Sequence, residues 1–245
     1  MECIFTIVMS HPTIPGTSHI RLARPAPHGL SACKHHGRLG VLGGAYNPIT
    51  LAHLAIANTS MQAFALHEVL LLLPQVPPHK TIFGASLEQR LTMMQLAVAD
   101  HPALSVGLST HGLFIDIYQA LPAVYPQQPE VFFITGRDAA ERILTWHYED
   151  TETTLHQMFR SFQLIVCDRD GVFRLPDDPR LEPYRHRIHR CLLPASYQHI
   201  SSTEVRQRCH QGLAIEPLVP PAVARYLQEH GLYRNAPTPA HEEVE

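Results

Sequence analysis

The residues best suited to chemistry follow a short apolar segment. Residues 43–53 read GGAYNPITLAH. The two leading glycines lack Cβ atoms where the chain must turn, and they let a ligand approach the backbone. Thr50 and His53 are three residues apart, so they share one face of the next helix, beside the free amides and positive dipole end of its first turn. This pattern predicts a phosphate-binding turn, and the alternative is a plain strand-to-helix turn with a surface histidine. Asn47 is the expected cap of that helix, with Pro48 in its first turn.

A second expected helix start carries hydroxyl and guanidinium groups in the string ISSTEVR, which ends at Arg206. Ser201 with Glu204 fits a capping box, which by itself explains the pattern as the start of a helix. The same start offers free amides and the hydroxyls of Ser202 and Thr203 to an anion. Arg206, one turn later, is a fork-shaped donor for phosphate oxygens. A cap and a phosphate site can therefore coincide here.

Two further segments place polar groups where expected strands end. The segment PPHK ends at Lys80, and its rigid Pro-Pro pair directs a histidine and a lysine over the expected crevice. Gly136 and Asp138 follow an apolar run, and Trp146 lies one short helix later. A carboxylate there can accept ribose hydroxyls or hold a metal-bound phosphate, and an indole can stack on a pyridine ring. The alternatives are a solvated loop lysine, an aspartate that caps a helix and a half-buried indole.

The elements that must position these residues alternate along the chain. Apolar runs predict strands at residues 38–42, 68–73, 103–108, 130–135, 163–167 and 189–193. Helices are predicted at residues 49–66, 86–100, 114–125, 139–144, 203–211 and 220–230. Strands that are apolar on both faces and alternate with helices indicate a parallel sheet covered on each side. The expected fold class is α/β, a doubly wound, Rossmann-like parallel sheet with helices on both faces and ligands beyond the carboxyl ends of the strands.

Length and composition limit the class of protein. The chain has 245 residues, of which 45% are hydrophobic and 17% charged, with a formal net charge of −3. These values exclude a chain that is disordered throughout. The net charge also shows no excess of basic residues of the kind that is typical of a nucleic-acid-binding protein. No apolar run reaches the roughly 18 residues of a membrane helix. The five cysteines form no CxxC pair and no tight metal-ligand spacing occurs, so we expect no bound structural metal, no membrane contact and a cytoplasmic location.

The ends of the chain differ from its middle. Residues 1–37 are rich in proline, histidine, glycine and serine, which predicts a poorly ordered N-terminal extension. A strand at residues 4–9 is the less favoured alternative. Residues 38–234 form the expected single domain, and residues 235–245 read as a C-terminal tail.

Taken together, the motifs resemble those of the HIGH-type nucleotidylyltransferases, above all the nicotinate- and nicotinamide-mononucleotide adenylyltransferases. The usual signature is Gly-Gly-Ser/Thr-Phe-Asp/Asn-Pro-Ile/Val-His-x-Gly-His. Here Thr50 replaces the first histidine, Ala52 replaces the third glycine, and His53 keeps the last histidine. The string ending at Arg206 resembles the Ile-Ser-Ser-Thr-x-Ile/Val-Arg motif of the mononucleotide enzymes, and the segment ending at Lys80 resembles Pro-His-Lys of the bacterial nicotinate-nucleotide enzymes.

The resemblance covers roughly residues 38–233 and implies an activity. The implied enzyme joins ATP, accompanied by Mg²⁺, to nicotinate mononucleotide and forms a dinucleotide and pyrophosphate in NAD biosynthesis. The implied catalytic residues are His53, Lys80 and Arg206. The implied ATP and phosphate contacts are Gly43, Gly44, Ala45, Tyr46, Thr50, Ser201, Ser202 and Thr203. The implied nucleotide and acceptor contacts are Gly136, Asp138, Trp146 and Asp116. Its partners are then ATP and a pyridine mononucleotide, with a homo-oligomer as an open option.

Two departures from the family pattern keep alternatives open. Bacterial relatives usually carry Ser-Tyr-Thr-x-Asp-Thr where residues 112–117 read GLFIDI, which keeps only Asp116. That stretch helps form the pyridine nucleotide pocket in the family, so nicotinamide mononucleotide, phosphopantetheine or a cytidylyl transfer are alternatives. Thr50 and Ala52 motivate a catalytically inactive nucleotide-binding regulator. The closing segment, residues 217–233, also resembles the family, and its helical spacing predicts packing rather than chemistry.

Overall fold

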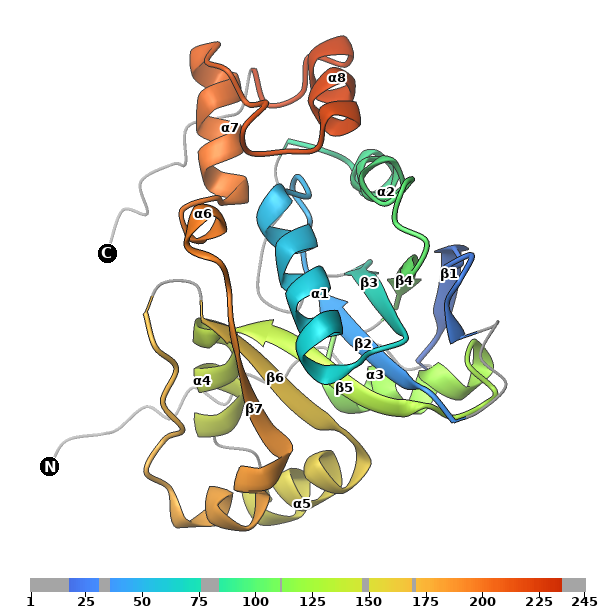
Figure 1. Ribbon diagram of the computed structural model, residues 1–245, viewed down its shortest axis with the longest axis vertical. Coiled ribbons are helices and arrows are strands. Elements are labelled where there is room, and N and C mark those ends of the chain that lie inside the picture. Colours follow the sequence, from blue (N-terminus) through green and yellow to red (C-terminus); the bar gives the residue numbers. More distant parts are fainter. Residues whose placement is uncertain are drawn as a thin grey trace, which may run out of the picture.

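A single sheet organises the computed structural model of the chain, which describes residues 18–30, 36–75, 84–110, 112–146, 150–168 and 171–234 (Figure 1). Within these residues, seven strands pair in the order β1-β4-β3-β2-β5-β6-β7. Strands β2 to β7 are parallel to their neighbours, and β1 runs antiparallel to β4 at one edge. The strands are β1 (Ile20–Arg24), β2 (Arg38–Gly43), β3 (Glu68–Pro74), β4 (Leu104–Ser109), β5 (Glu130–Gly136), β6 (Gln163–Asp168) and β7 (Ile188–Leu192).

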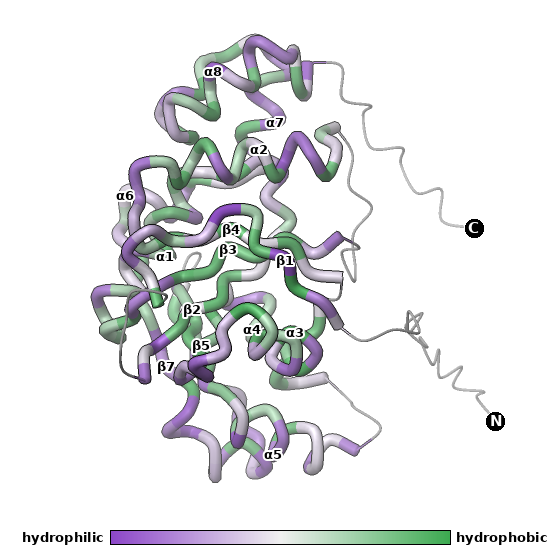
Figure 2. Tube along the Cα trace, turned by 90° about the vertical axis from the view of Figure 1, so that its right-hand side faces the viewer, coloured by the Kyte–Doolittle hydropathy of each residue, from purple (hydrophilic) through white to green (hydrophobic). Residues whose placement is uncertain are grey.

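Helices cover both faces of the sheet. Those that the structure describes are α1 (Leu51–Phe64), α2 (Leu87–Ala97), α3 (Phe114–Ala120), α4 (Arg137–Thr145), α5 (Thr151–Ser161), α6 (Ala195–Gln198), α7 (Ser202–Gln211) and α8 (Pro221–Glu229), with 3-10 turns η2 (Leu121–Ala123) and η3 (Pro179–Arg187). Helices α1, α2, α7 and α8 share one apolar core, and α3, α4 and α5 share the other. The strands contribute side chains to both cores, because successive side chains of a strand point to opposite faces of the sheet. In β3, for example, Leu71 lies in the first core and Leu70 in the second. Figure 2 shows hydrophobic residues along the central strands.

The direction of winding reverses between β2 and β5. From β2 the chain adds β3 and then β4 on one side, and it later adds β5, β6 and β7 on the other side. Leu42 of β2 pairs with Ile134 of β5, so the two strands end close together at Gly43 and Gly136. In open α/β sheets, ligands bind beyond the carboxyl ends of the strands at such a reversal. The fold therefore directs the search for a site to these two strand ends.

The predicted fold class is confirmed. All six predicted strands are present. In the central strands apolar side chains fill buried positions on both faces of the sheet, whereas in the edge strand β7 only Cys191 is buried. The sequence did not predict α5, α6 or η3. Among the helices that the structure describes, none combines the length and the apolar character needed to cross a membrane.

The expectation of a poorly ordered extension over residues 1–37 is wrong for residues 18–30. Residues 20–24 form β1, and Leu30 is buried with its N–H donating to the Glu68 Oε2 atom at 2.8 Å. This strand is hard to recognise because it is short, only one of its five side chains is fully buried, and its partner β4 lies more than eighty residues away. The alternative strand at residues 4–9 and the tail at 235–245 lie outside the described residues.

Candidate active site

The turn after β2 folds over one of its own side chains. Tyr46 has a φ of 44°, and its ring is buried beneath the turn with the hydroxyl donating to the Leu42 carbonyl. A Cβ at Gly44 would lie 3.2 Å from that ring, so a larger residue there would require the ring to shift by a few tenths of an ångström. A Cβ at Gly43 would have no atom of the described residues within 4 Å. The turn is therefore packed on its inner side and open at Gly43, where the sheet reverses.

The first helix begins with a contact between the two residues that share its leading face. Thr50 is the N-cap of α1, and its backbone N–H donates to the His53 Nδ1 atom at 3.1 Å. The Thr50 hydroxyl lies 2.8 Å from the same nitrogen. With Nδ1 accepting, the proton of a neutral His53 ring lies on Nε2, which makes Nε2 a donor. The Tyr46 and His53 rings are 5.1 Å apart between centroids, so the imidazole is oriented from two sides.

The prediction that Asn47 caps this helix is wrong. The helix begins at Leu51, and Asn47 is buried with its Oδ1 atom accepting from the Tyr233 hydroxyl at 2.7 Å. Asparagine and threonine are both good caps, so the local sequence does not decide between them. The long-range contact with Tyr233 occupies the Asn47 side chain, and Thr50 takes the cap.

The second helix begins where the sequence predicts and reaches across to the first. Ser201 caps α7, accepting from the Glu204 N–H at 3.0 Å, whereas the Glu204 carboxylate pairs with Arg208 instead of closing a capping box. The Ser202 hydroxyl donates to the Pro48 carbonyl at 2.8 Å. Arg206 donates from Nη1 to the Asn47 carbonyl at 2.8 Å, and from Nη2 to the Thr203 hydroxyl at 3.1 Å. Because a guanidinium has five N–H donors, these two bonds leave donors for a ligand.

The starts of α1 and α7 therefore meet at one place. Side chains of α7 hold the carbonyls of Asn47 and Pro48, and His53 follows within one turn of helix. Figure 1 shows α7 above the end at which α1 begins. Two positive helix ends thus face the same region beyond the sheet, which is a favourable setting for a polyphosphate.

The residues expected to contact the acceptor lie at the end of β5 and in or directly after the helices α3 and α4. Gly136 ends β5, and a Cβ there would meet no atom of the described chain within 4 Å. It is also the N-cap of α4, so the alternative that Asp138 caps this helix is wrong. The Asp138 side chain is 79% exposed and lies 3.4 Å from an Arg137 nitrogen. Trp146 follows α4 and is 39% exposed, and Asp116 lies half-buried in the first turn of α3.

Lys80 and the segment around it, residues 76–83, lie outside the described residues. In the part of the chain that the structure describes, no group of three or more histidine, cysteine, aspartate or glutamate side chains could hold a metal ion.

The sequence did not predict the role of two polar residues that hold the turn. Arg90 of α2 is only 4% exposed and donates from Nη1 to the Ala45 carbonyl at 2.8 Å; burial lowers the pKa of its guanidinium. Tyr233 lies in a segment that the sequence assigned to packing alone, yet its hydroxyl reaches Asn47. An arginine within an apolar helical face was the available signal for Arg90. Nothing in the local sequence distinguishes Tyr233.

Comparison with known proteins agrees with this geometry. A protein-family model described as cytidylyltransferase-like matches residues 41–208. A probable nicotinate-nucleotide adenylyltransferase of Moorella thermoacetica is 34% identical over 208 residues, covering 81% of this chain and 92% of the relative. A protein with the same description from Bordetella pertussis is 32% identical, covering 80% of this chain and 98% of the relative.

Among solved structures, the nicotinic acid mononucleotide adenylyltransferase of Plasmodium falciparum, complexed with NaAD, superimposes with a TM-score of 0.63. That match has 18% sequence identity and covers 81% of this chain and 98% of the other, which supports the fold. The chain belongs to the cytidylyltransferase-like family, among the nicotinate-nucleotide adenylyltransferases.

Proposed function

We propose that this chain transfers the adenylyl group of ATP to nicotinate mononucleotide and releases pyrophosphate, a step that forms a dinucleotide of NAD biosynthesis. The observation that carries the proposal is the meeting of two helix starts at residues 47–53, with His53 on one and Arg206 on the other. The names of the relatives at 32–34% identity support the choice of acceptor.

The reaction requires little covalent chemistry from the protein. A phosphate oxygen of the acceptor attacks the α-phosphorus of ATP, a new P–O bond forms, and the bond to the β-phosphate breaks. The bonding electrons leave with pyrophosphate, and no covalent enzyme intermediate is required. A phosphate is already an adequate nucleophile, so the protein must mainly align the two substrates and offset negative charge.

Each helix start has a role in that arrangement. His53, oriented through Nδ1 by Thr50, donates from Nε2 to an ATP phosphate oxygen, beside the turn of Gly43, Gly44, Ala45 and Tyr46. Within that turn the Gly44 amide already donates to the Leu72 carbonyl. The start of α7 supplies its amides and the hydroxyls of Ser201 and Thr203 to the departing β- and γ-phosphates, while the Ser202 hydroxyl holds the Pro48 carbonyl beside them. Arg206 adds its remaining guanidinium donors to the same group. Lys80 bridges donor and acceptor phosphates, a role that rests on the sequence motif alone.

Mg²⁺ belongs to the substrate in this proposal. Magnesium commonly binds through phosphates and waters with few protein ligands. This fits a site in which the described residues offer no metal-holding cluster. The metal then arrives on the ATP phosphates and adds to their charge neutralisation, while the positioning is done by side chains and amides of the chain.

The acceptor side uses the end of β5 and the helices α3 and α4. The exposed indole of Trp146 is suited to stack on a pyridine ring, and the Asp138 carboxylate is suited to accept ribose hydroxyls. Gly136 leaves the strand end open for a nucleotide, and Asp116 begins the neighbouring helix.

A panel of substrates tests the proposal. Pyrophosphate release is measured with ATP against nicotinate mononucleotide, nicotinamide mononucleotide and phosphopantetheine, and with CTP in place of ATP. We expect the highest kcat/KM for ATP with nicotinate mononucleotide. A preference for another acceptor, which the sequence at 112–117 motivates, would replace the proposed substrate. ATP binding by calorimetry without turnover on any acceptor would identify a nucleotide-binding regulator instead.

A further inference from the structure

The turn that precedes α1 is held by side chains from three other parts of the chain. Arg90 of α2 binds the Ala45 carbonyl, and Ser202 and Arg206 of α7 bind the carbonyls of Pro48 and Asn47. Tyr233, beyond α8, binds the Asn47 side chain. We call residues 45–48 the phosphate turn. These four partners lie 45 to 186 residues away in the sequence, so tertiary contacts hold the conformation of the turn.

Tyr233 is held in an unusual conformation to make its contact. Its φ is 63°, in the left-handed region that a tyrosine adopts at a cost. Its ring lies 2.7 Å from where a Cβ of Gly84 would be, so it packs directly on a glycine backbone. The side chain is only 3% exposed. Strain of this kind persists where the surroundings determine the conformation, and it is concentrated at functional sites.

The positive charges of Arg206 and Arg90 both act on the Tyr233 hydroxyl. Burial raises the pKa of Tyr233, and the positive charges of Arg206 and Arg90 oppose that rise. The hydroxyl therefore remains protonated at neutral pH and keeps donating to the Asn47 Oδ1 atom, at 2.7 Å. Tyr233 thus contacts the phosphate turn directly and lies within electrostatic reach of both arginines that bind the carbonyls of that turn.

Arg90 acts on the other side of the turn. It is buried in a helix whose other buried residues are two methionines and an alanine, and its Nε atom has no hydrogen-bond partner among the described residues. A buried guanidinium is costly unless it is paired. In a trans peptide the C=O and the next N–H point in opposite directions, so holding the Ala45 carbonyl toward α2 turns the Tyr46 N–H away from that helix.

We propose that Tyr233, acting with Arg90, is a positioning residue of the adenylyl-transfer site. The two side chains fix the phosphate turn from opposite ends, Arg90 at Ala45 and Tyr233 at Asn47, and so aim the amides of the turn and His53 at ATP. The assignment rests on the proposed function. It makes the segment that follows α8 part of the active-site support instead of a packing element alone.

The substitution Tyr233→Phe tests this role, because it removes one hydroxyl and keeps the ring on Gly84. We expect kcat to fall about tenfold, since small misplacements of binding groups are costly in the transition state. The KM for ATP is expected to change less than kcat, and the melting temperature to change little, because one hydrogen bond contributes only about 1 kcal/mol to folding. The matched control is Tyr226→Phe, the same change on α8, which should leave kcat unchanged.

A double-mutant cycle separates positioning from general stability. If Tyr233 acts through Asn47, then Asn47→Ala also lowers kcat, and the double variant is no slower than the slower single variant. Wild-type kcat in Tyr233→Phe, or losses that multiply in the double variant, would overturn the assignment while wild-type turnover upholds the proposed function. Absence of dinucleotide formation by the wild-type chain itself would overturn both.

Discussion

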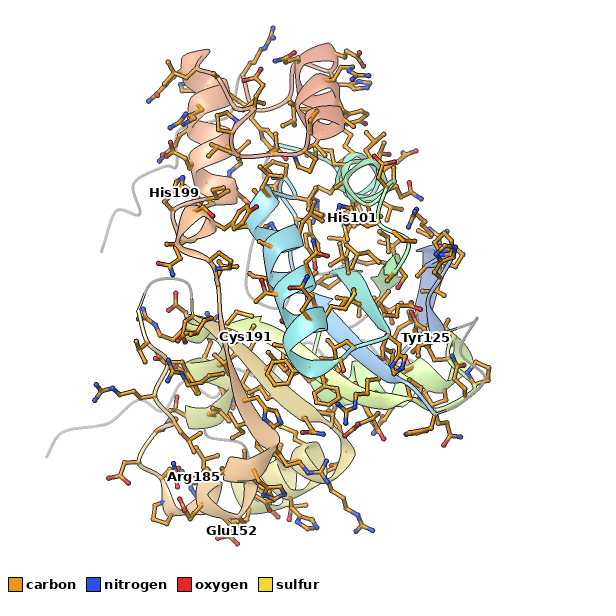
Figure 3. The ribbon with its side chains drawn as sticks, viewed as in Figure 1. His101, Tyr125, Glu152, Arg185, Cys191 and His199 are labelled. Carbon is orange, nitrogen blue, oxygen red and sulfur yellow. The ribbon has the colours of Figure 1, made fainter. Side chains whose placement is uncertain are left out.

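The two ends of the sheet differ in how far their polar side chains are buried. At the amino ends of the strands, the buried carboxylate of Glu68 accepts from the Ser105 and Tyr125 hydroxyls and from the Leu30 N–H. At the carboxyl ends, His53 and Arg206 are only half-buried. Figure 3 labels Tyr125 at the first end and His199, beside α7, well away from it.

The difference separates stability from function. The Glu68 cluster is closed, because its donors and acceptors are satisfied inside the protein, and it ties the segment before β2 to β3 and β4. Burial is the main reason that the pKa of Tyr125 is raised, so its hydroxyl stays a donor to Glu68. The helix starts at the other end keep donors for a ligand. Substitutions at the two ends should therefore change different measurements.

The largest effect is expected from His53→Ala. Removing a preoriented donor to the reacting phosphates should lower kcat by about 10²- to 10³-fold, the range seen for loss of one transition-state donor. The melting temperature should change little, because the ring is half-buried and the hydrogen bond that its Nδ1 atom accepts contributes only about 1 kcal/mol. His199→Ala, an exposed histidine beside α7, is the control and should retain activity. Near-normal turnover of His53→Ala would remove His53 from its role.

The corresponding change at the amino ends of the strands is Glu68→Leu. It leaves the donors of Leu30, Ser105 and Tyr125 without their acceptor, and each unsatisfied buried group costs about 1–3 kcal/mol. We expect the free energy of unfolding, measured by urea titration, to fall by about 3 kcal/mol. The kcat of the fraction that stays folded should match wild type. A loss of kcat without a loss of stability would contradict the assignment of stability to this end of the sheet and of function to the other.

A smaller effect on activity is expected from Arg206→Lys. Lysine keeps the charge but cannot reproduce the forked contacts with Asn47 and Thr203 while also binding phosphate. Pyrophosphate release should slow by roughly tenfold or more, with stability nearly unchanged. Arg208→Lys, two residues later and paired with Glu204, is the matched control and should keep full activity. Equal rates for both variants would argue against the phosphate contact.

The smallest effects come from the helix caps, which allow the sharpest comparison. Ser201 caps α7 at the proposed phosphate contact, and Ser86 caps α2, which carries Arg90 but no group proposed to touch ATP. Replacing either serine with alanine should cost about 1 kcal/mol of unfolding free energy. Only Ser201→Ala should also slow turnover. If both variants keep wild-type kcat, Ser201 contributes a cap and no phosphate contact.

How much of this could be predicted from the sequence depends on the range of the contacts involved. The parallel strands were predictable, because runs such as Val69 to Leu73 are apolar on both faces. The start of α7 at Ser201 was predictable from a local signal. Strand β1 and the cap at Thr50 were not, because they depend on β4 and on Tyr233, respectively.

The same limit applies to the site. His53 and Arg206 carry recognisable motifs, and the structure confirms that their helices meet. Arg90 and Tyr233 were absent from the predicted site, because their importance lies in single hydrogen bonds to Ala45 and Asn47 across 45 and 186 residues of sequence. Sequence motifs thus identify groups that face the ligand more readily than groups that hold them in place.

A crystal structure of the chain with a non-hydrolysable ATP analogue would test the central claim most directly. The account predicts one triphosphate shared by both helix starts, with the His53 Nε2 atom and the Arg206 guanidinium each within about 3.2 Å of its oxygens. A triphosphate bound by only one of the two helices, or bound elsewhere on the sheet, would contradict it.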